Sequence, residues 1–432
     1  MFFVSIILLV LYLVSLKIIR NSLLNKIMKF LVFLYSIQII MAIWDPYNYY
    51  QLSLSSVVMF NIQIVFFILG VILYEKRYSR IKYPTITFKW PCVKINNFMM
   101  LIITILFLYS CYNYNRMQSF LLTMATSTHE GREYYYTTFF PSYTLRIIDY
   151  FLTSFKYIAY TISLTLLFRN GFKLNLKETY FIILTVIIYI LLLLTAQSRL
   201  DIFIFVFMLM LFAYIANTYD KIKFRKKILP FILITGVGVV MLFLIVTILR
   251  VNLSMDTFNL DLVEQLVIEP FATYFYVPIL AFDYAKDTML NYDYPLCGLC
   301  TFSCIVDTFL LPFIFIDRNI SSLSMNTLLG NTIGIGMYFP SGKHWMAMYT
   351  GCANYYLDFW YFGFAIFPFL HGYILSKLVY LFRIRLIPYL LLPFMFYMSF
   401  RHATSLGIQS VETVFFIIWV LLIVKNKAIS YR

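Results

Sequence analysis

Long apolar runs separated by short polar stretches recur from one end of the chain to the other. A helix needs roughly 17 to 25 predominantly apolar residues to cross the hydrocarbon core of a bilayer. The pattern predicts eleven membrane-spanning helices, at residues 2–17, 30–45, 52–74, 97–114, 147–168, 179–196, 202–219, 228–249, 355–380, 386–402 and 413–424. The predicted fold is therefore an all-α polytopic membrane protein.

The composition agrees with this pattern and excludes a soluble domain. Of the 432 residues, 62% are hydrophobic and 12% are charged, whereas soluble proteins carry roughly 25% charged residues. Residues 1–16 lack the basic start and the small-residue cleavage site of a signal peptide, so we expect them to remain as the first helix. The net charge of +15 would suggest nucleic acid as partner in a soluble protein. In a membrane protein the distribution of charge between loops matters more, so membrane lipids and no nucleic acid are expected.

Basic residues concentrate in alternate loops, which sets the predicted orientation. These loops hold 24 of the 34 basic residues but only three of the 19 acidic ones, and they lie near residues 17–29, 75–94, 169–178, 220–227, 377–385 and 425–432. By the positive-inside rule they are cytoplasmic. Eleven spans then put the N-terminus outside and the C-terminus inside.

The opposite face carries the two longest connecting segments. Residues 1–249 are expected to hold eight helices and an outer loop at 115–146, residues 250–354 to form a large outer loop, and residues 355–432 to hold the last three helices. Within the large loop, the apolar stretches 271–280 and 302–315 are too short or too interrupted to span, so we expect short interfacial helices there. No internal repeat is visible, which speaks against an inverted-repeat transporter.

Two charges interrupt one of the most apolar regions. Residues 180–218 contain only Arg199 and Asp201 as charged residues. As one helix this run would measure roughly 58 Å, about twice the bilayer core. It must fold back near residues 197–201, and the predicted topology places that turn, with its guanidinium, at the outer boundary of the membrane.

Other cations share this predicted boundary. Arg250 and Arg401 end two helices on the outer side, and Arg146 and Lys156 lie near the outer entry of another. Anchoring of helix ends by long basic side chains is one explanation. However, cations away from the cytoplasmic side are costly and usually functional. Arginine also matches phosphate oxygens in a two-pronged geometry, so the set predicts a pyrophosphate site formed by Arg199, Arg250, Arg401, Arg146 and Lys156.

Several of these arginines lie in motifs that resemble Wzy-type O-antigen polymerases, the oligosaccharide repeat-unit polymerases. Residues 195–201 (TAQSRLD) resemble that family's motif of a small residue, Ser or Thr, and Arg, and residues 249–252 (LRVN) resemble the arginine that opens its large periplasmic loop. Residues 354–370 resemble the segment that re-enters the membrane, although Trp360 replaces its usual first glycine. Residues 399–403 (SFRHA) are similar to its short arginine-containing loop before the last helix.

The resemblance implies a glycosyltransferase of the GT-C type in the bacterial inner membrane, with its active site facing the periplasm. Such an enzyme takes a glycan from undecaprenyl pyrophosphate and joins it to the non-reducing end of another lipid-linked repeat unit, forming O-antigen polysaccharide. Its substrate partner would be the lipid-linked oligosaccharide. Whether a polysaccharide chain-length regulator also binds stays open.

The reaction requires a base for the acceptor hydroxyl and a groove for sugars. His402 is the preferred base, because the pKa of histidine lies near the working pH. Asp307, Glu269 and Asp358 are the alternatives. Aromatic and polar residues of the outer segments are candidate sugar contacts: Tyr274, Tyr276, Lys343, His344, Tyr355 and Asp358.

No cofactor or metal is expected. The outer face lacks an Asp-X-Asp motif and clustered histidines, and the chain has no phosphate-binding glycine loop. A disulfide between Cys297 and Cys300 stays open. Two other functions also stay open: an O-antigen ligase, which uses the same donor, and a lipid-linked oligosaccharide flippase.

Overall fold

The chain is built almost entirely of helices. The computed structural model describes residues 1–79, 88–124, 143–170, 173–196, 199–220, 269–288, 295–305, 337–345, 351–402 and 411–427, together with positions 230, 233–238, 241, 308 and 429–430. Within these residues, seven helices are long and apolar enough to cross a membrane: Ser22–Trp44, Leu54–Tyr78, Asn97–Ser119, Ile147–Asn170, Leu176–Thr195, Ile202–Tyr219 and Cys352–Leu381. The protein is therefore an all-α, multi-pass membrane protein.

The chain forms two compact units, and neither is continuous in sequence. Unit 1 comprises Met1–Ile86, Ile268–Phe382 and Met395–Val414, and unit 2 comprises Thr87–Val267, Arg383–Phe394 and Phe415–Arg432. Each unit therefore combines an early part of the chain with later ones.

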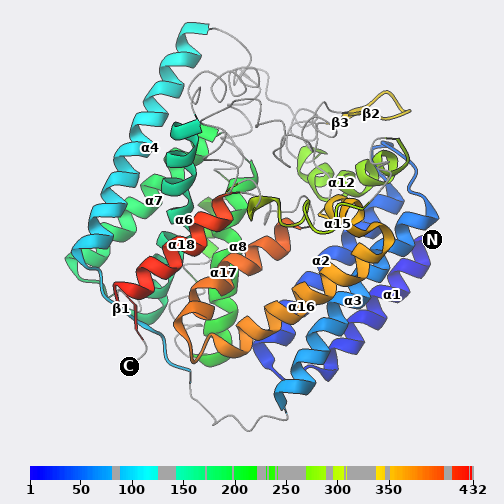
Figure 1. Cartoon of the computed structure of the whole chain (residues 1–432), viewed down its shortest axis with the longest axis horizontal. Helices are drawn as coiled ribbons and strands as arrows, with labels where there is room; N and C mark the ends of the chain where they lie inside the picture. Colours follow the sequence, from blue (N-terminus) through cyan, green and yellow to red (C-terminus); the bar gives the residue numbers. More distant parts are fainter. Residues whose placement is uncertain are drawn as a thin grey trace. The chain divides into compact units, whose positions relative to one another are not determined.

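Unit 1 is framed by long helices that lie side by side (Figure 1): α1 (Phe2–Ser15), α2 (Ser22–Trp44), α3 (Leu54–Ser79) and α16 (Gly363–Leu381). The α1–α2 connection turns through a short 3-10 helix and ends at Asn21, whose side chain accepts hydrogen bonds from the backbone N–H of Leu23 and Leu24. This N-cap satisfies donors that the first turn of α2 leaves unpaired. Glu75 of α3 joins the same end by accepting from the N–H of Arg20 at 2.5 Å and from the hydroxyl of Tyr380 at 3.1 Å.

Helices α3 and α16 approach each other backbone to backbone. A Cβ atom placed on Gly70 of α3 would lie 2.1 Å from the carbonyl oxygen of Phe369, and one placed on Gly372 of α16 would lie 2.2 Å from the carbonyl oxygen of Phe67. No side chain fits at either position. Small residues of this kind let membrane helices pack by direct van der Waals contact, where lipid offers no hydrophobic driving force.

The opposite end of unit 1 is closed by shorter elements. They are α12 (Glu269–Thr288), the strands β2 (Met337–Tyr338) and β3 (His344–Trp345) of an antiparallel hairpin, α15 (Cys352–Phe359) and the last residues of α17 (Leu386–Arg401). Between α15 and α16, Trp360 has a positive φ of 47° and begins a 3-10 turn. Gly363 then starts α16 against the carbonyl oxygen of Tyr355, which would lie 2.0 Å from an added Cβ.

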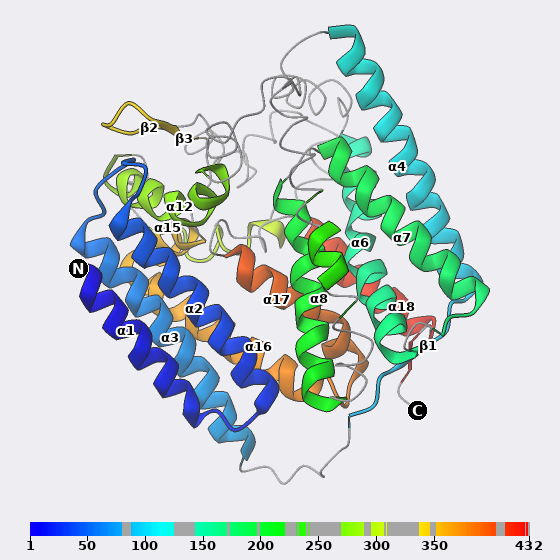
Figure 2. The same ribbon diagram turned by 180° about the vertical axis from the view of Figure 1, so that it is seen from behind.

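Unit 2 is a second bundle, seen from behind in Figure 2. It contains β1 (Cys92–Val93), α4 (Asn97–Met124), α6 (Tyr143–Asn170), α7 (Leu176–Ala196), α8 (Arg199–Tyr219), most of α18 (Glu412–Lys425) and β4 (Ile429–Ser430). Trp419 of α18 donates its indole N–H to the carbonyl oxygen of Phe151 at 2.7 Å. Near the paired strands β1 and β4, Trp90 stacks on Phe212 with ring centroids 5.9 Å apart.

Most predicted helices lie within a few residues of their expected bounds, but three differ. Helix α2 begins at Ser22, eight residues before the predicted start at 30. Helix α4 continues to Met124, ten residues beyond the predicted end at 114, so it occupies the start of the predicted outer loop. The single helix predicted at 355–380 is divided at Trp360. The apolar stretch 271–280 lies inside α12, a helix of 20 residues. The stretches 228–249 and 302–315 lie mostly outside the described residues.

We predict that the glycine contact limits the stability of unit 1. Gly70→Ala or Gly372→Ala inserts a methyl group against a backbone oxygen, and such overpacking costs about 1–3 kcal/mol. The melting temperature of the purified protein in detergent should fall for either variant. Gly236→Ala is the matched control, because nothing lies within 4 Å of its added Cβ. Equal melting temperatures for all three variants would contradict the close crossing.

Candidate functional site

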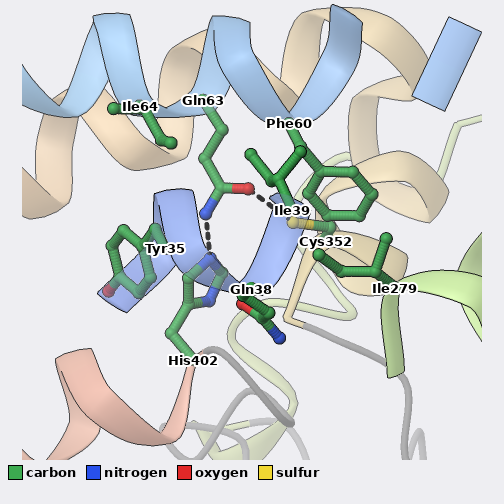
Figure 3. A pocket seen from close by; sticks show the side chains of 9 residues that line it. All are labelled: Tyr35, Gln38, Ile39, Phe60, Gln63, Ile64, Ile279, Cys352 and His402. Atoms are coloured by element: carbon green, nitrogen blue, oxygen red, sulfur yellow. Dashed lines mark hydrogen bonds between the residues drawn. The ribbon is translucent and has the colours of Figure 1, made fainter. Parts of the chain in front are cut away.

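Polar side chains meet inside unit 1 around His402, and a small cavity lies among them (Figure 3). The cavity has a volume of about 10 Å³, which is room for roughly one water molecule. Residues from α2, α3, α12, α15 and the end of α17 form its walls: Tyr35, Gln38, Ile39, Phe60, Gln63, Ile64, Ile279, Cys352 and His402. Five elements that are far apart in sequence thus meet at one point.

His402 contacts Gln63 through Nε2, Tyr355 through its ring and Gly351 through its backbone carbonyl. Its Nε2 lies 2.6 Å from Nε2 of Gln63, and Oε1 of Gln63 accepts a hydrogen bond from the thiol of Cys352 at 2.7 Å. The ring stacks on Tyr355 at 5.1 Å between centroids. Its backbone carbonyl accepts from the N–H of Gly351 at 3.2 Å. The side chain is only 3% exposed, so His402 is part of the packed interior.

A second histidine extends the polar interior. Nε2 of His371 lies 2.7 Å from the hydroxyl of Ser399, which itself donates to the carbonyl oxygen of Met395 at 2.8 Å. The hydroxyl of Tyr35 donates to the carbonyl oxygen of Ser399 at 2.5 Å. The two histidine rings are 6.3 Å apart. Ionisable and amide groups inside an apolar bundle are costly and usually mark function, so we take this cluster as the candidate site.

A buried ion pair ties the loop between α2 and α3 to α12. Nζ of Lys286 lies 3.0 Å from Oδ1 of Asp283, and the carboxylate of Asp283 also accepts from the hydroxyls of Ser53 and Ser56. Lys286 donates in addition to Ser55 and Ser56. Burial alone would raise the pKa of Asp283, but these hydrogen bonds outweigh it and hold the pKa below its usual value.

Aromatic residues gather beside this ion pair. The hydroxyl of Tyr276 donates to Asp45 at 3.1 Å, and burial together with the charge of Asp45 raises the pKa of Tyr276. Lys343 donates to the carbonyl oxygen of Tyr47 and lies over the ring of Tyr49 at 4.7 Å. Burial and the nearby charges of Glu269 and Asp45 raise the pKa of Tyr49 to about 12. The group faces Glu269 at the first turn of α12.

Asp358 holds the turn at residues 297–300. Its two carboxylate oxygens accept from the backbone N–H of Cys300 at 2.9 Å and of Thr301 at 2.7 Å, and the side chain is fully buried. Burial and the charge of Asp358 raise the pKa of the Cys300 thiol to about 12. Cys297, the first residue of the turn, is exposed and has a positive φ of 51°. All six cysteines are free, so the structure contains no bond between Cys297 and Cys300.

The predicted sugar contacts are mostly buried. Tyr355 is 3% exposed and stacks on His402 and Phe367, which leaves no ring surface open to a sugar. Tyr276 and Asp358 are fully buried and engaged in the hydrogen bonds described above. Lys343 is half-buried against the tyrosines. The side chains of Tyr274 and His344 lie outside the described part of the structure.

The predicted cations belong to different units. Arg401 ends α17 in unit 1, is half-buried and precedes His402 directly. Arg146, Lys156 and Arg199 belong to α6 and α8 of unit 2, where Nζ of Lys156 lies 5.2 Å from the ring of Tyr157. The side chains of Arg146 and Arg199 are not described, and Arg250 and Asp307 lie outside the described residues altogether. Convergence of these cations on one site stays a prediction.

The residues that sequence reasoning missed are the partners of His402 and the polar side chains of the cavity. Gln63 lies inside the apolar run 52–74 and Gln38 inside the run 30–45. An amide within a membrane-spanning stretch is itself a signal, because it must find a hydrogen-bond partner there. No sequence pattern connects Cys352 with His402. Within the described residues, no three His, Cys, Asp or Glu side chains lie close enough together to hold a metal ion.

Comparison with known proteins adds no relative: no protein-family model, no curated protein and no solved structure matches the chain.

We predict that the ion pair on α12 acts as a unit. Asp283→Asn leaves the buried ammonium of Lys286 without its counter-charge, and breaking a buried pair in this way costs about 3–5 kcal/mol. The melting temperature in detergent should fall clearly, and adding Lys286→Met to the same chain should recover most of the loss. No recovery in the double variant would mean that the serine contacts of Asp283, and not the charge pair, stabilise α12.

The pH dependence follows from the lowered pKa of Asp283. The folded protein stabilises the carboxylate form of Asp283. This form therefore adds fully to the free energy of unfolding above the pKa of an unfolded Asp, about 3.9. Its contribution is lost as the pH falls through the lower pKa of the folded state.

Proposed function

We propose that the protein is a membrane glycosyltransferase that polymerises oligosaccharide repeat units carried on undecaprenyl pyrophosphate, as in Wzy-type O-antigen polymerases. The proposal includes eleven membrane spans, a location in the bacterial inner membrane and an active site at the periplasmic face. It includes helix 228–249, of which the structure describes only a few positions.

The observation that carries the proposal is the division of unit 1 into two chemically different ends. The segments assigned to the outer face contact one another: Ser53 and Asp283, Ser341 and the carbonyl oxygen of Tyr49, and Gly351 and His402 are hydrogen-bonded pairs. The segments rich in Lys and Arg meet at the other end, where Glu75 links the α1–α2 turn to Tyr380. This separation is what the positive-inside rule requires of a chain with a single active face.

The end that carries Arg401 also carries parts of two of the four motifs of the resemblance, residues 354–370 and 399–403. Residues 354–358, Arg401 and His402 all belong to unit 1, with His402 stacked on Tyr355. In the proposed reaction, Arg401 would stabilise the negative charge that develops on the departing pyrophosphate. Preorganised charge of this kind is usually the largest single contribution to catalysis. Arg199, Arg250, Arg146 and Lys156 are proposed to contribute to the same pyrophosphate site.

The proposed reaction also needs a base for the acceptor hydroxyl, and the candidates are His402, Glu269, Asp307 and Asp358. Nε2 of His402 is occupied by Gln63, so this nitrogen would accept a proton from a sugar hydroxyl only after the amide moves away. Glu269 is half-buried at the first turn of α12, beside the tyrosines of the outer end.

We predict the orientation of the chain in the membrane through two native cysteines, Cys297 of unit 1 and Cys92 of unit 2. In cells with a permeabilised outer membrane, a membrane-impermeant maleimide should label a variant that keeps only Cys297, since this thiol is exposed on a segment assigned to the periplasm. A variant that keeps only Cys92, on the predicted cytoplasmic side, should react only after the inner membrane is lysed. Labelling of both thiols from the same side would exclude the proposed topology.

We predict that Arg401→Ala abolishes polymer while the protein remains in the membrane. Loss of one preorganised charge-stabilising group typically lowers the rate about 10²–10³-fold, and Arg401→Lys should recover little because lysine lacks the planar fork. The measurement is the lipopolysaccharide ladder of a deletion strain complemented with each variant. Arg77→Ala is the matched control. Arg77 lies near the C-terminal end of α3, at the end of unit 1 opposite to Arg401, where it contacts Tyr373.

The ladder also separates the competing functions. A polymerase defect leaves one repeat unit on the lipid A core, whereas loss of every repeat indicates a ligase or a flippase. A complete ladder from Arg401→Ala would remove this arginine from the reaction.

A further inference from the structure

Cys352, Gln63 and His402 form a chain of hydrogen bonds that runs in one direction. The thiol of Cys352 is protonated in this apolar interior, so it donates to Oε1 of Gln63 at 2.7 Å. The carbonyl end of the amide is thereby fixed toward Cys352. The NH₂ end then faces Nε2 of His402 at 2.6 Å, and Figure 3 shows the amide between the two residues.

This direction determines the tautomer of His402. An amide NH₂ group can only donate, so Nε2 of His402 must accept and carries no proton. A neutral imidazole has one proton, which therefore lies on Nδ1. The nearby His371 has the opposite assignment: the single proton of Ser399 is used at the carbonyl oxygen of Met395, so Ser399 accepts from an N–H at Nε2 of His371.

The proton on Nδ1 of His402 is a buried donor with nothing to receive it among the described residues. Nδ1 is fully enclosed and has no hydrogen-bond partner there. An unsatisfied buried donor costs about 1–3 kcal/mol. His402 also lines the cavity of about 10 Å³, whose size suits a single oxygen atom. The unpaired Nδ1 and the cavity belong to the same side chain, and an acceptor oxygen in the cavity would satisfy this donor.

We infer that the cavity is a binding site for one acceptor oxygen, which accepts a hydrogen bond from Nδ1–H of His402, and that Gln63 and Cys352 are positioning residues that hold the imidazole in this tautomer. The oxygen belongs to a water molecule or to a phosphate group that reaches the cavity. The inference does not rest on the proposed polymerase reaction. If that reaction occurs, His402 acts on it as a hydrogen-bond donor and not as the base.

The test is nitrogen-15 NMR of the full-length protein, labelled at histidine and reconstituted in lipid. The chain contains four histidines, and His402→Asn and His371→Asn assign the two signals of interest. In the wild type, His402 should carry its proton on Nδ1 and His371 on Nε2. A wild-type His402 protonated on Nε2 would overturn the inference, because Nδ1 would then be an acceptor.

Variants of the chain test its direction. Gln63→Glu replaces the donor with a carboxylate, which accepts from Nε2–H, so the His402 proton should move to Nε2. Cys352→Ser keeps a donor and should preserve the wild-type tautomer, whereas Cys352→Ala should leave a mixture of both. An unchanged tautomer in both Gln63→Glu and Cys352→Ala would show that these residues do not set it.

The Nδ1 signal of His402 also shows whether the acceptor oxygen belongs to water or to a phosphate group. Magnetisation transfer from water to the Nδ1 proton without added ligand identifies water as the acceptor. A shift of the Nδ1 signal only on addition of inorganic pyrophosphate identifies a phosphate oxygen. An Nδ1 proton that shows neither effect would overturn the site. All three readouts are independent of polymer formation, so failure of the site and failure of the polymerase proposal are distinguishable.

Discussion

The backbone contact between α3 and α16 is the constraint on which the interior of unit 1 depends. Gly70 and Gly372 face the opposing helix at distances that exclude any side chain, and this fixes both the separation and the register of the two helices. Gln63, Phe67 and Gly70 follow the spacing of four and then three residues that keeps them on one helical face. Once Gly70 is docked on α16, Phe67 therefore packs on His371 at 5.4 Å, and Gln63 comes next to Cys352, at the start of the helix that precedes α16.

Polar groups inside this interior are stable only as a connected set. An amide or imidazole that is removed from water without a partner costs several kcal/mol in an apolar environment. Gln63 satisfies both ends of its amide with residues from two other elements, and His402 gains its place through Gln63, Gly351 and Tyr355. Apolar residues of similar size would fill this space without such requirements. The presence of the set, with one donor left over beside a cavity, is therefore better explained by binding than by packing.

The helices could be predicted from the sequence, but the contacts between them could not. Apolar runs indicate where a chain crosses a membrane, because length and hydropathy alone decide it. The extension of α4 to Met124 was missed because polar residues such as Asn113 and Asn115 interrupt the run, although its backbone hydrogen bonds continue. The break at Trp360 was missed because every residue from 359 to 362 is aromatic and reads as apolar helix. His402 was predicted as a site residue because it follows Arg401 in sequence. Its partners, however, come from residues 63, 351, 352 and 355, and no local pattern connects these positions.

The contacts of the buried carboxylates in unit 1 limit which of them could act as a base. Glu75 accepts from two backbone N–H groups and a tyrosine, Asp283 pairs with Lys286, and both oxygens of Asp358 bind backbone N–H groups. Glu75 joins segments at one end of unit 1, and Asp283 and Asp358 join segments at the other. Among the described residues, only Asp283 of these three has a cationic partner, and the other two carboxylates are stabilised by hydrogen bonds. A base must have an oxygen or nitrogen that a substrate can reach in its unprotonated form. Asp358 has neither oxygen to spare, and His402 presents a proton at Nδ1 and a blocked lone pair at Nε2. If the proposed reaction takes place, its base is therefore expected nearer the surface of unit 1, where the half-buried Glu269 of α12 is a candidate and Asp307 lies outside the described residues.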